Sequence, residues 1–234
     1  MDSNETGGTA VVIGGTGGIG AAMVAALEQS GTFTEVIGLS RRSDPALDLF
    51  DEESIIRAAN GLKARQAELR LVFDATGFLH GDGFAPEKSL SAITPEHMAR
   101  AFAVNAIGPA LLMKHFLPLL PKTGRSVFAT LSAKVGSIGD NTLGGWYSYR
   151  ASKAALNQLV HTAAIELARR KPAAICVALH PGTVDTGLSS DFAKNGLTVR
   201  QPQEAAALLM GVLDSLTPTQ TGGFFDYNGN PLPW

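Results

Sequence analysis

A glycine-rich turn near the start of the chain constrains the fold more than any other feature. Residues 9–13 form a short apolar run with β-branched side chains, which predicts a buried strand. The run leads directly into Gly-Gly-Thr-Gly-Gly-Ile-Gly at residues 14–20, and apolar residues then recur at helical spacing until Gly31. A strand, a glycine turn and a helix in this order let the backbone approach a pyrophosphate at the helix N-terminus. We therefore favour a nucleotide site over an ordinary glycine-rich turn.

The residues after the second predicted strand indicate which nucleotide this is. The glycine turn lacks the Lys-Ser/Thr of an ATP-binding P-loop, although its spacing also differs from Gly-x-Gly-x-x-Gly. A strand at residues 35–39 ends in Ser40, Arg41 and Arg42, where an acidic residue would bind the ribose 2′-OH of NAD. Arginine side chains suit a 2′-phosphate, so we predict NADP(H), with NAD(H) possible. Two solvated surface arginines are the alternative.

Strands and helices alternate along the whole chain. Further strands are predicted at 69–73, 126–131, 175–179 and 222–226, and helices at 52–66, from Thr94 to about 118, 149–169 and 202–213. This alternation predicts an α/β fold, a single-domain Rossmann-type doubly wound parallel sheet with helices on both faces. The domain spans residues 1–234, with 1–8 as a disordered tail and 187–201 as a short polar loop. Thr94 and Asp51 are expected to cap helices, and Pro109 to break one near Asn105.

Composition bounds the environment and the partners. The chain has 234 residues, 45% of them hydrophobic, and a net charge of -2, so neither nucleic acid nor an anionic membrane is an expected partner. No apolar run approaches the ~20 residues of a transmembrane helix, and the polar N-terminus is unlike a signal peptide. The one cysteine, Cys176, is expected to be a buried hydrophobe in a cytoplasmic protein. No metal is predicted, because His80, His97, His115, His161 and His180 lack metal-ligand spacing.

One pair of residues suggests proton-transfer chemistry. Tyr149 and Lys153 are four residues apart in a predicted helix, so they lie one turn apart on the same face. An ammonium group beside a phenol favours the phenolate, which would lower the pKa of the tyrosine and suit it to general acid or base catalysis. Alone, the pair is equally compatible with an exposed helix surface.

Taken in order, these motifs resemble the short-chain dehydrogenase/reductase family, and within it the small C-factor-like or Sniffer-like carbonyl reductases. The resemblance covers nearly the whole chain, and it rests on 14–20, Asp48, 74–77, Asn105, Ser132, 149–153 and 181–186. It implies a Ser-Tyr-Lys centre in which Tyr149 transfers the proton and Lys153 lowers its pKa and holds the nicotinamide ribose. It further implies that Ser132 holds the substrate oxygen and that Asn105 holds a water for proton relay.

The glycine turn, the basic pair and the resemblance together predict the cofactor contacts. Asp48 is expected at the adenine amine, and Thr186 at the carboxamide. The full set is Gly14, Thr16, Gly17, Gly18, Ile19, Gly20, Ser40, Arg41, Arg42, Asp48, Ala75, Thr76, Gly77, Asn105, Tyr149, Lys153, Pro181, Gly182, Val184 and Thr186.

The chain departs from the family pattern at three places. Ile13 stands where threonine is usual, and Asp74-Ala75 stands where Asn-Asn is usual. The third departure concerns the serine, because counting back from Gly136 in Ser-Ser-x-x-Gly puts Ala133 at the catalytic place. Counting along the strand from residue 126 gives Ser132 instead, and we prefer this count because pairing fixes strand register. Ser137 is a lesser candidate, and Tyr147 is interpreted as a loop or pocket residue.

The leading hypothesis is an NADPH-dependent carbonyl reductase that acts on a small-molecule carbonyl or alcohol. The alternative is a C-factor-like cell–cell signalling or regulatory protein that binds NAD(P) with little turnover. A sugar epimerase or dehydratase ranks lower, because those larger relatives carry an extra C-terminal region. The resemblance also implies a homodimer or homotetramer, formed partly through the long helix after Tyr149.

Overall fold

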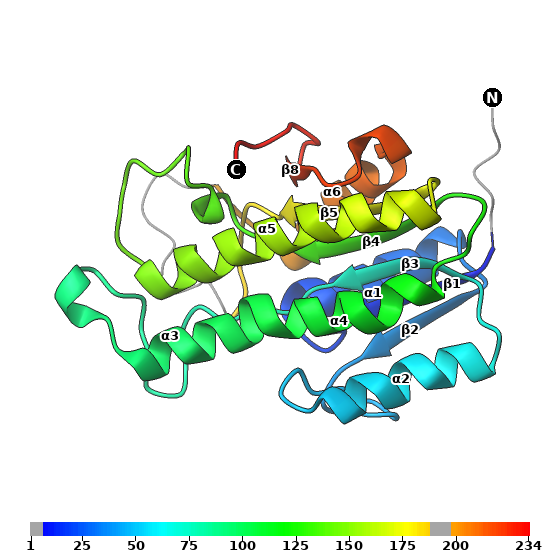
Figure 1. Cartoon of the computed structure of the whole chain (residues 1–234), viewed down its shortest axis with the longest axis horizontal. Helices are drawn as coiled ribbons and strands as arrows, with labels where there is room; N and C mark the ends of the chain where they lie inside the picture. The colour runs from blue at the N-terminus through cyan, green and yellow to red at the C-terminus, as the bar shows by residue number, and fades with distance from the viewer. Residues whose placement is uncertain (1–6, 188–197) are drawn as a thin grey trace.

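The computed structural model describes residues 7–187 and 198–234, and it confirms the predicted doubly wound parallel sheet (Figure 1). Six parallel strands pair in the order β2-β1-β3-β4-β5-β8. Their bounds are β1 Thr9–Ile13, β2 Glu35–Leu39, β3 Leu69–Asp74, β4 Ser126–Leu131, β5 Ala174–His180 and β8 Phe224–Asp226. Since β1 pairs with β2 on one side and β3 on the other, the winding reverses there. Such a switch point leaves a crevice at the carboxyl ends of the strands, where ligands bind.

Helices cover both faces of the sheet, as the alternation predicted (Figure 1). One face packs against α2 (Glu52–Ala64), α4 (Gly108–Phe116) and α5 (Tyr147–Arg170), and the other against α1 (Gly18–Ser30) and α6 (Pro202–Ser215). Because both faces are covered, β1 and β4 are buried along their whole length, which explains their continuous apolar runs. Cys176 is fully buried in β5, as expected, and burial raises the pKa of its thiol to about 12.

The long central helix contains an irregular turn instead of the predicted break. α3 (Pro95–Phe102) continues into α4 through a π-helical turn, η2 (Ala103–Ile107), in which the Gly108 N–H donates to the Ala103 carbonyl. Pro109 cannot donate to the Asn105 carbonyl four residues before it, so the backbone changes its bonding there without ending the helix. Thr94 and Asp51 cap α3 and α2, as predicted.

Several boundaries differ from the prediction. α2 ends at Ala64 because Gln66 has a φ of 51°, and α5 begins at Tyr147, which is therefore a helix residue. Gly7 and Gly8, expected in a disordered tail, are hydrogen-bonded to Thr32, Thr34 and Glu35, whereas residues 1–6 lie outside the described part of the chain. Residues 188–197 of the loop expected at 187–201 also lie outside the described part of the chain. A short strand pair was missed there, β6 (Thr183–Val184) with β7 (Val199–Arg200).

Short 3-10 turns complete the described elements: η1 Leu90–Ala92, η3 Leu117–Leu119, η4 Lys134–Gly136 and η6 Pro218–Gln220. One continuous helical run, Pro95–Leu119, is long and apolar enough by length and composition to cross a membrane, so the prediction that no segment approaches this was wrong. In the structure, Leu112 and Phe116 of this run are fully buried against the sheet. Its apolar character is therefore explained by its place in the core.

Candidate active site

A cavity of about 530 Å³ opens at the carboxyl ends of β1, β2 and β3, where the switch point predicts a ligand. It brings together a large part of the predicted cofactor set: Gly14, Thr16, Gly17, Ser40, Arg41, Arg42, Asp48, Ala75, Thr76 and Gly77. Ile13, Leu47, Leu49, Phe50, Phe78, His80, Gly81, Asp82, Arg100 and Val104 complete its lining. The remaining predicted residues lie outside this lining.

Close backbone contacts explain why the turn at the cavity floor is rich in glycine. Gly14 has a φ of 80°, in the region that favours glycine, and its carbonyl accepts from the Gly17 N–H at 2.9 Å. A Cβ on Gly20 would lie 2.1 Å from the Gly14 carbonyl oxygen. The N-cap of α1, Gly17, makes no side-chain capping bond. Because these glycines carry no side chains, a ligand in the cavity can approach the N–H groups at the start of α1 closely.

Backbone hydrogen bonds fix the chain at Ile13, where threonine was expected. Its side chain is fully buried, and its carbonyl accepts from the Ala75 N–H at 2.8 Å. The Gly14 N–H donates to the Leu39 carbonyl, also at 2.8 Å. The turn is therefore fixed to both neighbouring strands without a threonine side chain.

The rim of the cavity carries the basic pair. Arg41 and Arg42 are exposed, whereas Ser40 is 8% exposed and its Oγ accepts from the Arg42 N–H at 3.1 Å. The Ser40 N–H donates in turn to the Ser43 Oγ at 2.8 Å. These bonds fix the backbone of the turn and leave both guanidinium groups at the mouth of the cavity.

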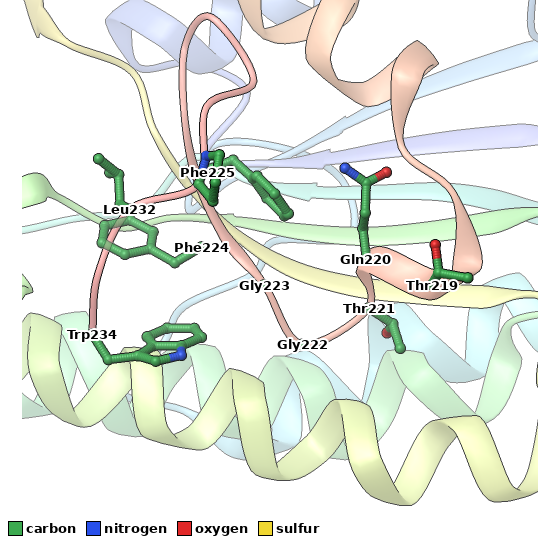
Figure 2. Close-up of a pocket in the computed structure, with 10 residues that line it drawn as sticks. Thr219, Gln220, Thr221, Gly222, Gly223, Phe224, Phe225, Leu232 and Trp234 are labelled. Atoms are coloured by element: carbon green, nitrogen blue, oxygen red, sulfur yellow. The ribbon is translucent and has the colours of Figure 1, made fainter.

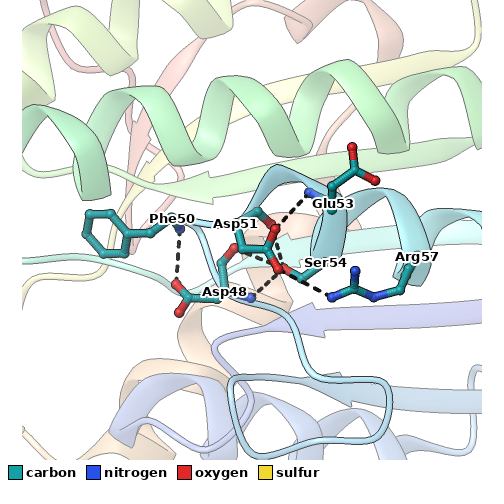
Figure 3. Close-up of polar contacts among 6 residues, drawn as sticks. All are labelled: Asp48, Phe50, Asp51, Glu53, Ser54 and Arg57. Atoms are coloured by element: carbon teal, nitrogen blue, oxygen red, sulfur yellow. Dashed lines mark hydrogen bonds and ion pairs between the residues drawn. The ribbon is translucent and has the colours of Figure 1, made fainter.

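Two aspartates and a serine organise the segment 48–54, whose first residues form one wall of the cavity (Figure 3). The Asp48 Oδ1 accepts from the Phe50 N–H at 3.0 Å, and the Ser54 hydroxyl donates to the Asp48 carbonyl at 3.0 Å. Asp51 caps α2 by accepting from the Glu53 N–H at 3.1 Å. Asp48 is therefore held at the cavity wall by its own loop, while Asp51 has the structural role expected for it.

Tyr149 and Lys153 are both buried in the first part of α5. Lys153 is 2% exposed, its Nζ donates to the Leu131 carbonyl at 2.7 Å, and it lies 6.0 Å from the centre of the Tyr149 ring. Burial lowers the pKa of Lys153 to about 8, opposed by the negative charge of Asp74. Burial also raises the pKa of Tyr149, so the expected lowering by Lys153 is not what this geometry gives.

Asp74 is a fully buried carboxylate at the end of β3. Its Oδ1 accepts from the N–H and hydroxyl of Thr76, at 3.0 and 2.6 Å, and its Oδ2 from the Thr130 hydroxyl at 2.7 Å. Burial raises the pKa of Asp74, whereas these bonds and Lys153 lower it. The acid that replaces the usual asparagine therefore supports the sheet edge and also acts electrostatically on Lys153.

Asn105 ties the π-helical turn to two other elements. Its side-chain amide accepts from the Phe78 N–H and donates to the Phe78 carbonyl, both at 2.7 Å, and donates to the Ser152 Oγ at 3.0 Å. Asn105 is fully buried. It thus joins the loop after β3 to the helix that carries Tyr149 and Lys153.

The structure places the candidates for the serine position in different surroundings. The Ser132 hydroxyl donates to the Asn157 Oδ1 at 2.6 Å and is buried on that side of the strand end. The next residue, Ala133, has extended backbone and packs in one apolar cluster with Leu79 and Tyr149. Alternation along an extended chain explains why the two side chains point apart. The place beside Tyr149 therefore carries a methyl group. Ser137 instead caps a turn, its Oγ accepting from the Asp140 N–H at 3.1 Å.

The segment 181–186 lies against the glycine turn. A Cβ on Gly18 would be 2.6 Å from the Thr186 Cγ2, so the first residue of α1 touches this segment directly. Gly182 has a φ of 80°, and β6 pairs with β7 directly after it. Pro181, Val184 and Thr186 are thereby held opposite the start of α1, although outside the lining of the large cavity.

Phe50, Phe78, Asp82 and Arg100 line the cavity but were missed by sequence reasoning. The Arg100 guanidinium lies 4.4 Å from the centre of the Phe50 ring, and its Nη2 is 2.9 Å from the Asp82 Oδ2. The sequence offered one signal, because residues 78–90, between β3 and α3, are polar and contain glycine. The partner on α3 could not be identified without the packing of that helix.

A smaller cavity of about 250 Å³ lies at the C-terminal end of the described chain (Figure 2). It is lined by residues 219–225, 231, 232 and 234, and none of the predicted site residues is among them. Trp234 stacks on Phe224 with ring centres 5.8 Å apart. Across residues 7–187 and 198–234, no group of three or more His, Cys, Asp or Glu side chains could hold a metal ion.

Comparison with known proteins places the chain among reductases and dehydrogenases. The model of the family described as enoyl-(acyl carrier protein) reductase matches residues 14–214. C-signal of Myxococcus xanthus is 39% identical over 137 residues, which cover 58% of this chain and 78% of that protein. The 1-hydroxy-2-glutathionyl-2-methyl-3-butene dehydrogenase of Rhodococcus sp. (strain AD45) is 32% identical over 82% of this chain and 80% of its own length.

Solved structures of carbonyl reductases share the fold. The carbonyl reductase Sniffer of D. melanogaster has a TM-score of 0.83 and 22% identity, over 97% of this chain and 99% of that one. An NADPH-bound carbonyl reductase from chicken fatty liver has a TM-score of 0.83 and 24% identity, over 97% of this chain and 94% of that one.

Proposed function

Because the chain belongs to the short-chain dehydrogenase/reductase family, we propose that it reduces a carbonyl compound to an alcohol with NADPH, with Tyr149 as the general acid. One observation carries the proposal. A buried lysine lies 6.0 Å from the ring of a buried tyrosine, and that tyrosine packs against Leu79, which lies between Phe78 and His80 of the cavity lining. Buried ionisable pairs of this kind are costly, and they cluster at functional sites.

The residues of the cavity fit NADP(H). The glycine turn would hold the pyrophosphate, Asp48 the adenine, and Arg41 and Arg42 the 2′-phosphate. Ala75, Thr76 and Gly77 would contact the adenosine half, and the segment 181–186 the nicotinamide. When bound, the cofactor supplies the hydride.

Tyr149 would donate its phenolic proton to the carbonyl oxygen as the hydride arrives. Burial raises its pKa, so the phenol is protonated at neutral pH, the form that reduction requires, although it is a weaker acid than an exposed tyrosine. Lys153, with a pKa near 8, would be largely protonated at neutral pH and would return a proton to the phenolate. The Asn105 backbone carbonyl, which Pro109 cannot donate to, would hold a water that links Lys153 to solvent.

This mechanism does not use Ser132. Its hydroxyl is bonded to Asn157, and the side chain next to Tyr149 is that of Ala133. Within the cluster of Leu79, Ala133, Tyr149, Val135 and Trp146, the phenol is the only hydroxyl group. Tyr149 would therefore bind the carbonyl oxygen without help from the strand.

The function is tested by NADPH oxidation with a panel of aldehydes, ketones and quinones, comparing wild type with Tyr149→Phe. The variant keeps the ring and loses the acid, so kcat should fall by about 10²–10⁴-fold. NADPH binding, measured by titration, should change little. Turnover that survives Tyr149→Phe would exclude Tyr149 as the acid.

The choice of cofactor is tested separately by Arg41→Ala. Loss of a charge-assisted bond to a phosphate is expected to weaken NADPH binding by roughly 10–100-fold. NADH lacks the 2′-phosphate, so its dissociation constant should remain within about 2-fold of wild type. Equal losses for the two cofactors in calorimetric titrations would contradict the 2′-phosphate site.

A signalling or regulatory protein that binds NAD(P) with little turnover is the second candidate. The likeness to C-signal favours it, and so does the missing hydroxyl at Ala133. NADPH binding without turnover on any member of the panel would support this candidate over the reductase. With either function, we propose that the protein is cytoplasmic and forms a homodimer or homotetramer.

A further inference from the structure

Helix α5, which carries Tyr149 and Lys153, begins without a capping side chain of its own. Its N-cap, Trp146, has a φ of 53°, and the preceding Gly144 and Gly145 have φ values of 64° and 66°. A non-glycine residue in this left-handed region is strained, because its Cβ approaches the following carbonyl oxygen. The first N–H groups of a helix also need acceptors from outside the helix. This entry turn therefore depends on another segment to hold its shape.

Glu87 supplies the missing contacts from the loop after β3. Its backbone carbonyl accepts from the Trp146 N–H, and its carboxylate accepts from the N–H and the hydroxyl of Ser148. The Ser148 N–H lies 3.2 Å from the Glu87 Oε2. Glu87 is 3% exposed, and a buried carboxylate at a helix N-terminus is stabilised by the helix dipole. The next residue of the helix is Tyr149.

His97, on α3, fixes the carboxylate from the other side. Its Nδ1 is 3.2 Å from the Glu87 Oε1, and the residue is 5% exposed. The imidazole stacks on the Phe84 ring, with centres 5.1 Å apart and an angle of 8°, and meets the Phe78 ring edge-on at 6.1 Å. A ring held in this way cannot turn away, so the Glu87 carboxylate keeps a fixed place.

The same two elements also form part of the cofactor cavity. The loop that leads to Glu87 contains Phe78, His80, Gly81 and Asp82, which line the cavity. Arg100, three residues after His97 on α3, also lines it and pairs with Asp82 at 2.9 Å. We propose that Glu87, held by His97, is a positioning residue that fixes the first turn of α5 and thereby fixes the place of Tyr149. This inference rests on the proposed reductase function.

The test compares Glu87→Gln with Glu52→Gln. The control removes the charge from a second glutamate–histidine pair, in which the Glu52 Oε1 lies 2.8 Å from the His115 Nε2, between α2 and α4. Loss of a supporting partner is expected to lower kcat by about 10–100-fold in Glu87→Gln, because small displacements of a catalytic group are costly. KM for NADPH should stay within about 2-fold, and kcat of the control should also stay within about 2-fold.

Amide hydrogen exchange gives a readout that does not depend on activity. In Glu87→Gln, residues 147–150 should exchange faster than in wild type, while the rest of α5 should not. Ser148→Ala, a milder change, should show the same effect to a smaller degree if Glu87→Gln does not fold. A wild type without turnover would contradict the reductase, and exchange alone would then decide this inference. Unchanged exchange at 147–150, or an unchanged kcat in an active enzyme, would overturn it.

Discussion

Ala133 puts a methyl group beside Tyr149, the proposed acid. We predict that Ala133→Ser adds a second donor to the carbonyl oxygen and raises kcat by roughly 10-fold, since one such donor is worth up to about 10²–10³. Steady-state NADPH oxidation measures the effect. Ser132→Ala is the matched control, because its hydroxyl is bonded to Asn157, and its kcat should stay within about 2-fold of wild type. The reverse pattern would restore Ser132 as the oxygen ligand.

The negative charge of Asp74 favours the protonated form of Lys153, as a counter-ion would. Burial lowers the pKa of Lys153 to about 8, and Asp74 opposes that shift. Reduction needs the protonated lysine, so kcat/KM should fall as pH rises through about 8. We predict that Asp74→Asn, which restores the family residue, moves this midpoint to lower pH, because the lysine loses its anion. Glu52→Gln should leave the midpoint in place. A midpoint that does not move in Asp74→Asn would exclude Lys153 as its source.

At the scale of residues, the sequence predicts the position of a side chain better than it predicts how burial shifts the pKa of that side chain. The spacing of Tyr149 and Lys153 correctly placed both on one helix, yet burial reverses the expected effect on the tyrosine pKa. Burial depends on which segments cover the pair, and spacing does not contain that information. The choice of serine stays a prediction for a different reason. Strand and loop counts gave neighbouring residues, and a shift of one residue reverses the face of an extended chain.

At the scale of elements, helix α5 has one face in the core and one at the surface. Its buried side packs in the core through Leu156, Val160 and Leu167, whereas Leu159 and Ile165 are 36% and 50% exposed. Ile107, at the start of the neighbouring α4, is 55% exposed. Figure 1 shows α4 and α5 side by side. Such surfaces are typical of contacts between subunits.

We predict that Ile165→Glu weakens the homodimer or homotetramer, because a charge at an apolar contact must be desolvated. Size-exclusion chromatography with light scattering should show a smaller mass for the variant than for wild type. Leu90→Glu, at a residue that is 69% exposed in η1, is the matched control and should keep the wild-type mass. A monomeric wild type, or equal masses in all three proteins, would contradict an interface on α5.

The ends of helices were predictable where the sequence has strong capping or helix-stop residues. The Thr94–Pro95 start, the Asp51 cap and the Gly31 stop all lie where the sequence put them. The π-helical turn was not predictable, because Pro109 indicates only that a backbone bond is missing. How the chain compensates depends on Asn105, whose side chain holds Phe78 and Ser152 in segments far away in the sequence.

At the scale of the whole molecule, alternating strands and helices were enough to predict the doubly wound sheet. The order β2-β1-β3-β4-β5-β8 reverses the winding between β1 and β3, and this reversal opens the crevice at the carboxyl ends of the strands. The link between Glu87, His97 and α5 was beyond the sequence. It joins residues 61 positions apart through a loop whose path only the packed structure defines.

The place of Trp146 gives the protein an internal optical reporter. The indole meets the Tyr149 ring with centres 6.2 Å apart, whereas Trp234, the second of two tryptophans, contacts His161 and Phe224. Replacing Trp234 by phenylalanine would leave a single indole beside the phenol. Its fluorescence would then follow any molecule that displaces water from Tyr149, so ligands could be found without knowing what reaction they undergo.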